Sequence, residues 1–127
     1  MSAHSTSKNF YRAESSIITK PKKALKLFEK VLIEEENLIE KRFSYNSASF
    51  IIMLSEKLEN YEKIIETTEK LFSLHEHAKQ RDQEVAIEIV SNCLQPDQPD
   101  FTLKMVKLIL ELTKGSQNQY LWFDCVL

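Results

Sequence analysis

Residues 19–36 read TKPKKALKLFEKVLIEEE, and this stretch determines how the rest of the chain is interpreted. Pro21 suits the first turn of a helix, because the N–H group that proline lacks would have no partner there. From Pro21 onward, apolar residues recur at steps of three and four, which is the spacing of one face of an α-helix. They are Ala24, Leu25, Phe28, Val31 and Leu32. The stretch therefore predicts an amphipathic helix that begins at Pro21.

The same apolar pattern returns twice, at intervals of about forty residues. It recurs at Ile64, Ile65, Thr68, Leu71 and Phe72, and again at Met105, Val106, Ile109, Leu112 and Thr113. A helix start precedes each copy, because Asn60 suits an N-cap and Asp100, after Pro99, suits the positive end of a helix. A repeat of this length is typical of helical hairpins that stack on one another.

Further amphipathic segments separate the three copies. We expect helices at about residues 37–58 and 80–95, another after Gly115, and a shorter one at about residues 7–18. The predicted fold is all-α: an α-solenoid of about seven helices, in which hairpins like tetratricopeptide repeats form a right-handed superhelical arm. Its parts are a flexible N-terminal tail at 1–8 and a helical-repeat domain at 9–127, with hairpins at about 21–58, 60–95 and 99–127, the last one truncated. A closed antiparallel helical bundle is the alternative, because it shows the same apolar faces.

The composition agrees with a helical globular chain. The 127 residues include a single glycine, too few for the turns of a sheet protein, and 43% of them are hydrophobic. Cys93 and Cys125 lie in apolar surroundings, so we expect free thiols in a reducing compartment. No apolar run approaches the roughly 18 residues of a membrane helix, and the first residues lack the apolar core of a signal peptide. We therefore expect a cytoplasmic and nuclear protein with no membrane partner.

The net charge of −2 conceals an uneven distribution. Residues 1–31 carry seven basic side chains against Glu14 and Glu29, a balance of +5, so the remaining residues sum to −7. This split favours an acidic partner near the start of the chain. It is weaker than the charge of a typical nucleic-acid-binding protein, so no nucleic-acid partner is expected.

Four lysines of the opening stretch are the first candidate partner-binding residues. They form a lysine stripe of Lys22, Lys23, Lys26 and Lys30, three of them spaced four apart on one helix face. Like charges at this spacing destabilise a helix by about 0.2–0.5 kcal/mol per pair, and cations in the first turn oppose the helix dipole. The stripe is either a docking surface or a solvated face on which Glu29 and Glu34 offset part of the repulsion. The acidic run at residues 34–36 is expected to mark a turn.

Trp122 and Phe123 form the second candidate partner-binding pair. They lie in an apolar segment, which we expect either another repeat or a partner to cover. We therefore expect the chain to be a truncated product or a fragment of a longer protein. No catalytic residue, metal, cofactor or small-molecule substrate is expected. His75 and His77 are two apart and diverge on a helix, which indicates surface histidines rather than metal ligands. Neither cysteine has a second cysteine at C-x-x-C spacing or a basic neighbour to lower its pKa. The lone Gly115 excludes a glycine-rich phosphate loop.

Three segments of the chain resemble the N-terminal helical repeats of COP9 signalosome subunit 2, a PCI-domain family related to a subunit of the proteasome lid. The segments are residues 10–36, 58–94 and 118–127. The matching places hold Phe10 and Tyr11, then Pro21, Lys22, Ala24 and Leu25, then Phe28, Lys30, Val31 and Leu32, and finally Leu121 to Phe123. The resemblance extends over residues 9–127.

The resemblance implies a non-catalytic scaffold: a curved arm that contacts other signalosome subunits and helps to hold cullin–RING ubiquitin ligases for deneddylation, while the isopeptidase resides in a different subunit. The winged-helix domain and the acidic N-terminal tail of the family are not among these residues. Ser44 stands where family members carry a lysine implicated in contacts with inositol polyphosphate, so that role is not expected here. A proteasome-lid-like subunit or a stand-alone repeat adaptor is the alternative.

Overall fold

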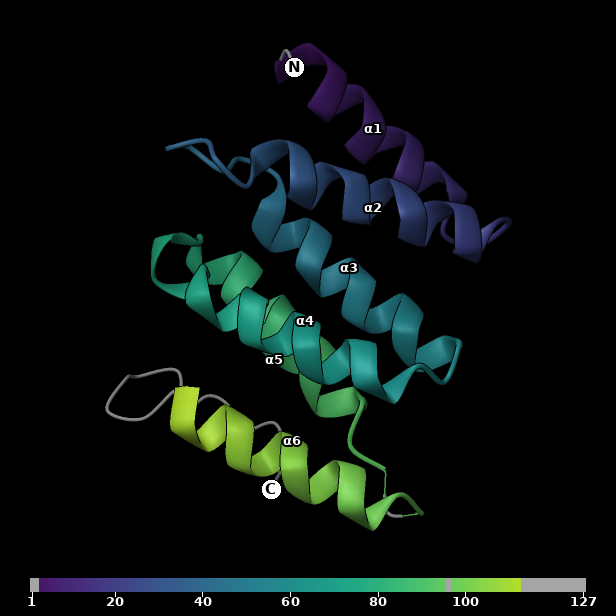
Figure 1. The fold of residues 1–127 in the computed structure, drawn as a ribbon, viewed down its shortest axis with the longest axis vertical. Helices are drawn as coiled ribbons and strands as arrows, with labels where there is room; N and C mark the ends of the chain where they lie inside the picture. Colours follow the sequence, from purple (N-terminus) through teal and green to yellow (C-terminus); the bar gives the residue numbers. More distant parts are fainter. Residues whose placement is uncertain (1–2, 96, 113–127) are drawn as a thin grey trace.

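The computed structural model describes residues 3–95 and 97–112, and every regular element within them is a helix (Figure 1). The elements are α1 (Ala3–Ser16), α2 (Pro21–Glu35), α3 (Ser44–Lys57), α4 (Tyr61–Ser73), the short 3₁₀ helix η1 (His75–His77), α5 (Gln80–Asn92) and α6 (Pro99–Leu112). The predicted all-α class is confirmed. The helix expected after Gly115 lies outside the described residues.

The three helix starts predicted from the repeat are those of α2, α4 and α6. Pro21 occupies the first turn of α2, and Pro99 opens α6 with Asp100 in its first turn. The Asn60 side chain caps α4 by accepting a hydrogen bond from the backbone N–H of Lys63 at 3.2 Å. Local sequence signals therefore fix where these helices begin.

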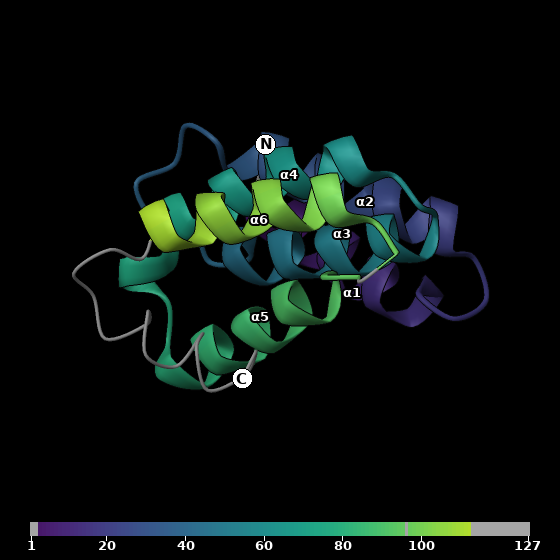
Figure 2. The same ribbon diagram turned by 90° about the horizontal axis from the view of Figure 1, so that it is seen from below.

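The helices form two layers. Figure 2 shows α2, α4 and α6 along one side and α1, α3 and α5 along the other. Three residues matched by the forty-residue spacing, Phe28, Thr68 and Ile109, are all completely shielded from solvent. The sequence repeat thus marks helices that share a layer and present equivalent faces to the core.

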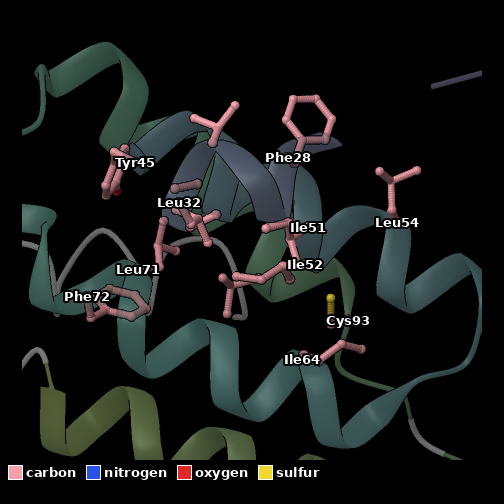
Figure 3. Close-up of a cluster of buried hydrophobic side chains, with 14 of the residues drawn as sticks. Phe28, Leu32, Tyr45, Ile51, Ile52, Leu54, Ile64, Leu71, Phe72 and Cys93 are labelled. Carbon is pink, nitrogen blue, oxygen red and sulfur yellow. The ribbon is translucent and has the colours of Figure 1, made fainter. Parts of the chain in front are cut away.

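Helix α3 lies at the centre of the described residues. Nine of its 14 residues are buried, and it packs against α2, α4 and α5. Much of its buried surface is small, since Ser44, Ser47, Ala48, Ser49 and Ser55 are all enclosed. Small side chains let three neighbouring helices approach closely. Its large residues Ile51, Ile52 and Leu54 project into the apolar cluster drawn in Figure 3.

Aromatic rings join α1 to this core. The ring centroid of Phe10 lies 4.9 Å from that of Phe43 and 5.8 Å from that of Phe28. Phe28 in turn stacks on Phe50 of α3 at 5.0 Å. Such aromatic pairs contribute about 0.5–1.5 kcal/mol beyond the area that they bury.

The expected helix at 37–58 begins later than predicted. Residues 36–43 form a connection, and Ile39, which was placed on the apolar stripe of that helix, is fully exposed. The connection returns to the core because the buried carboxylate of Glu35 accepts hydrogen bonds from the backbone N–H of Phe43, at 2.9 and 3.1 Å, and from the Ser44 hydroxyl, at 2.6 Å. α3 has no side-chain cap from its own first residue, so Glu35 supplies one.

The predicted flexible tail at residues 1–8 is also corrected, since α1 begins at Ala3 rather than near residue 7. Its first turns are attached to α2: Thr6 and Asn9 donate hydrogen bonds to the two carboxylate oxygens of Glu34, at 2.7 and 2.9 Å. Two members of the acidic run at residues 34–36 therefore join helices, whereas only a turn was expected there.

The expected hairpin at 60–95 is not a closely packed pair. α5 packs against α3 rather than against α4, and α4 packs against α3 and α6. The corner between α4 and α5 is held by His75, which was expected on the surface but is buried. Its Nδ1 atom lies 2.6 Å from the Tyr45 hydroxyl, and its backbone carbonyl accepts from the Gln83 side chain at 2.6 Å.

Replacing the buried carboxylate of the α2–α3 connection tests this description of the fold. We expect Glu35→Ala to lower the free energy of unfolding by about 1–3 kcal/mol, because the N–H of Phe43 and the Ser44 hydroxyl then lose their acceptor. The neighbouring exposed Glu36 supplies the matched control, and Glu36→Ala should change stability by less than about 0.5 kcal/mol. Urea denaturation followed by circular dichroism measures both. Equal losses in the two variants would show that the Glu35 contacts are not structural.

Candidate functional site

The lysine stripe lies on the solvent side of α2. All four of its side chains are exposed, while Ala24, Phe28 and Val31 on the opposite side are buried. The first turn of α2 contains no acidic residue, and Lys20 at its N-cap makes no side-chain capping bond. The positive end of the helix dipole is therefore surrounded by cations, an arrangement that disfavours the helix.

The glutamates that were expected to offset these charges have other partners. Glu29 pairs with Lys63 of α4, whose ammonium lies 2.6 Å from its carboxylate, and Glu34 accepts the bonds from α1. Over residues 3–95 and 97–112, no stripe lysine forms an ion pair with an acidic side chain. Glu29 and Glu34 thus form no ion pair with the stripe, whose ammonium groups remain available to an external anion.

A small groove adjoins the stripe between α2 and α4. It has a volume of about 200 Å³. Its apolar floor is formed by Leu32, Ile33 and Ile51, with Thr67 alongside. Charged side chains rim it, with Glu29 and Lys63 at one end and Glu66 and Lys70 on the α4 side.

Ile33 connects the groove to the stripe. It is 68% exposed, although its neighbours Val31 and Leu32 are buried. Three residues after Lys30 and seven after Lys26, it continues the face that carries those lysines. Sequence reasoning missed this residue, but an isoleucine at helical spacing from three lysines was the available signal.

A larger groove of about 820 Å³ lies where α1, the connection at 36–43 and the α4–α5 corner meet. Tyr11 and Ile39 line it with exposed apolar surface, and the guanidinium of Arg42 lies 5.2 Å from the Phe43 ring centroid. Lys79 and Asp82 place opposite charges on its other wall. This groove therefore carries charges of both signs, whereas the lysine stripe is only positive.

The other candidate residues predicted from the sequence either have a structural role or lie outside the described residues. Trp122, Phe123 and Cys125 lie outside the described residues. Ser44 is buried and donates to Glu35, so a side chain at this position belongs to the helix connection. Cys93 is buried, and this burial raises the pKa of its thiol to about 12. Such a thiol is almost wholly protonated at neutral pH and is a poor nucleophile.

Among residues 3–95 and 97–112, no group of three or more histidine, cysteine, aspartate or glutamate side chains is arranged to hold a metal ion. No helix in the same ranges is long and apolar enough to span a bilayer.

Comparisons with known proteins find no family model, curated protein or solved structure that matches the chain. The resemblance to COP9 signalosome subunit 2 therefore stays a prediction from the sequence.

The unfavourable placement of the stripe leads to a stability prediction. We expect Lys22→Glu to raise the free energy of unfolding by about 0.5–1 kcal/mol, because a carboxylate suits the start of α2 and also pairs with Lys26 four residues on. Lys70→Glu, in the last turn of α4, should have the opposite sign, since a carboxylate opposes the dipole there and lies four residues from Glu66.

Thermal or urea unfolding at low salt measures both changes, and high salt should reduce them. A loss of stability in Lys22→Glu would show that the lysines support the helix, and their unfavourable placement would then no longer indicate a partner.

Proposed function

We propose that the chain is a non-catalytic scaffold that binds other proteins, and that the lysine stripe of α2 is its principal contact surface. The observation that carries this proposal is that four exposed ammonium groups share one helix and that none is paired with an acidic side chain among the described residues. An acidic surface on a partner would satisfy them.

The free-energy cost of the stripe to α2 favours a binding role over a purely solvated face. Each close pair of like charges and each cation in the first turn destabilises α2 by a few tenths of a kcal/mol. Exposed lysines placed elsewhere on the helix would give the same solubility without that cost. Long lysine stems can also cover apolar surface while their ammonium groups stay in water, which lets the stripe adapt to a partner.

The architecture that best suits this role is an α-solenoid arm. Its support is the forty-residue repeat, together with the shared layer and burial of α2, α4 and α6. In such an arm each helical layer leaves an extended outer surface for other proteins.

The more specific proposal is an arm like that of COP9 signalosome subunit 2, present in nucleus and cytoplasm. It would contact other signalosome subunits and help to hold a cullin–RING ligase for deneddylation. Support for this comes from the resemblance of the segments at 10–36, 58–94 and 118–127, the first of which contains the stripe. A proteasome-lid-like subunit or a stand-alone adaptor is the second candidate, favoured by the same repeat.

Purification of the tagged protein from its source cells, followed by size-exclusion chromatography and mass spectrometry, tests the proposal. We expect copurification with an isopeptidase subunit, winged-helix subunits and a cullin. Changing all four stripe lysines to glutamate should remove the cullin while the chain stays folded.

The matched control carries Lys104→Glu and Lys107→Glu, two exposed lysines of α6, and should retain every partner. Recovery of proteasome particles instead would select the second candidate. A chain that elutes without any partner would refute the scaffold role.

A further inference from the structure

The groove between α2 and α4 lies at the end of the lysine stripe, and the two features together describe a more selective site than either alone. The helical rise of 1.5 Å per residue places Lys26 about 9 Å and Lys22 about 15 Å along α2 from the level of Leu32. A partner that lies along the stripe therefore reaches the groove within one short segment of chain.

The groove has the character of an anchor pocket. Its volume of about 200 Å³ accommodates one branched apolar side chain, and Leu32, Ile33 and Ile51 offer apolar contact. Ile33 is exposed, so a partner side chain can cover it without any rearrangement of the core. Single anchors that fill such pockets commonly dominate the affinity of a protein interface.

The charges around the groove differ between its two sides. The α2 side carries the stripe lysines, which have no acidic partner among the described residues, whereas the α4 side carries Glu66 beside Lys70. Glu29 and Lys63 already pair with each other across the groove. The α4 side therefore carries charges of both signs, and the lysine stripe of α2 is the surface that favours carboxylates of a partner.

We propose that this composite site binds an extended acidic segment of another protein, with one leucine-like side chain in the groove and carboxylates along the lysine stripe. Extended chain rises about 3.3 Å per residue, so a carboxylate opposite Lys26 lies about three residues from the anchor. The inference rests on the proposed scaffold function and adds the chemistry of the partner to it. An apolar anchor also distinguishes a protein partner from a polyanion without apolar side chains.

Two fluorescein-labelled peptides of equal charge test the inference on the 127-residue chain. Both consist of aspartate and glutamate residues around one central position, which is leucine in one peptide and serine in the other. We expect fluorescence anisotropy to show about tenfold tighter binding of the leucine peptide, equivalent to about 1.4 kcal/mol. Added salt should weaken both peptides but leave their ratio unchanged, because screening acts on the charges and not on the apolar contact.

Two variants separate the parts of the site. Ile33→Ser should reduce the leucine preference to less than about twofold while the salt dependence persists. Its matched control is Leu103→Ser, which removes an exposed leucine of α6 and should leave the preference intact. Lys26→Glu combined with Lys30→Glu should weaken both peptides by a similar factor.

Several results would overturn the inference. Equal binding of the two peptides, or a preference that survives Ile33→Ser, would show that the groove is not an anchor pocket, while the scaffold function could still stand on the cellular purification. Tighter peptide binding by Trp122→Ser would indicate that the chain's own C-terminal segment occupies the groove. Self-association that Ile33→Ser abolishes would indicate a second copy as the occupant.

Discussion

The carboxylate of Glu35 is the constraint on which the rest of the fold depends. It ends α2, is buried, and accepts hydrogen bonds from the first groups of α3. A buried charge is tolerated only when polar partners replace the water that it has lost, and three hydrogen bonds from Phe43 and Ser44 do so here. The same bonds satisfy the start of α3, which has no side-chain cap of its own. One side chain thus joins the end of α2 to the start of the central helix.

The position of α3 determines what remains exposed. Because α3 takes the buried side of α2, the stripe lysines of α2 face solvent, and the gap between α2 and α4 above Ile51 becomes the small groove. The ion pair between Glu29 and Lys63 spans that gap. It is a partly exposed pair and contributes at most about 1 kcal/mol, so it positions the two helices more than it stabilises them. The proposed contact surface is therefore a consequence of the core and not a separate element added to it.

Local patterns in the sequence predict the helices that have one apolar face. Pro21, Asn60 and Pro99 signal the starts of α2, α4 and α6, and the forty-residue spacing predicts that each carries one apolar face. The same reasoning misplaces the start of α3, because a helix buried on several sides has no clear polar face and its cap comes from Glu35, eight residues before Phe43. The bonds from Thr6 and Asn9 to Glu34, which attach α1 to α2, join residues 28 and 25 positions apart, and helical periodicity does not report contacts of that kind.

In the candidate site, too, features within one helix could be predicted and contacts between helices could not. The lysine stripe could be predicted, because its residues lie on one helix and need only the period of that helix. The groove could not, since Ile33 and Lys63 come from different helices and meet only in the tertiary structure. His75 was expected on the surface for the same reason, because its partner Tyr45 lies 30 residues earlier in the chain.

Amide hydrogen exchange of the free chain, resolved by helix, tests the central role of α3 most directly. α3 is enclosed by α2, α4 and α5, whereas α1 and α6 cover the two ends of the array, so opening free energies should be highest in α3. We predict that the amides of Ile51, Ile52 and Leu54 exchange most slowly among the described residues and that those of α1 and α6 exchange earlier. Exchange of the α3 amides as fast as those of α6 would contradict a fold organised around that helix.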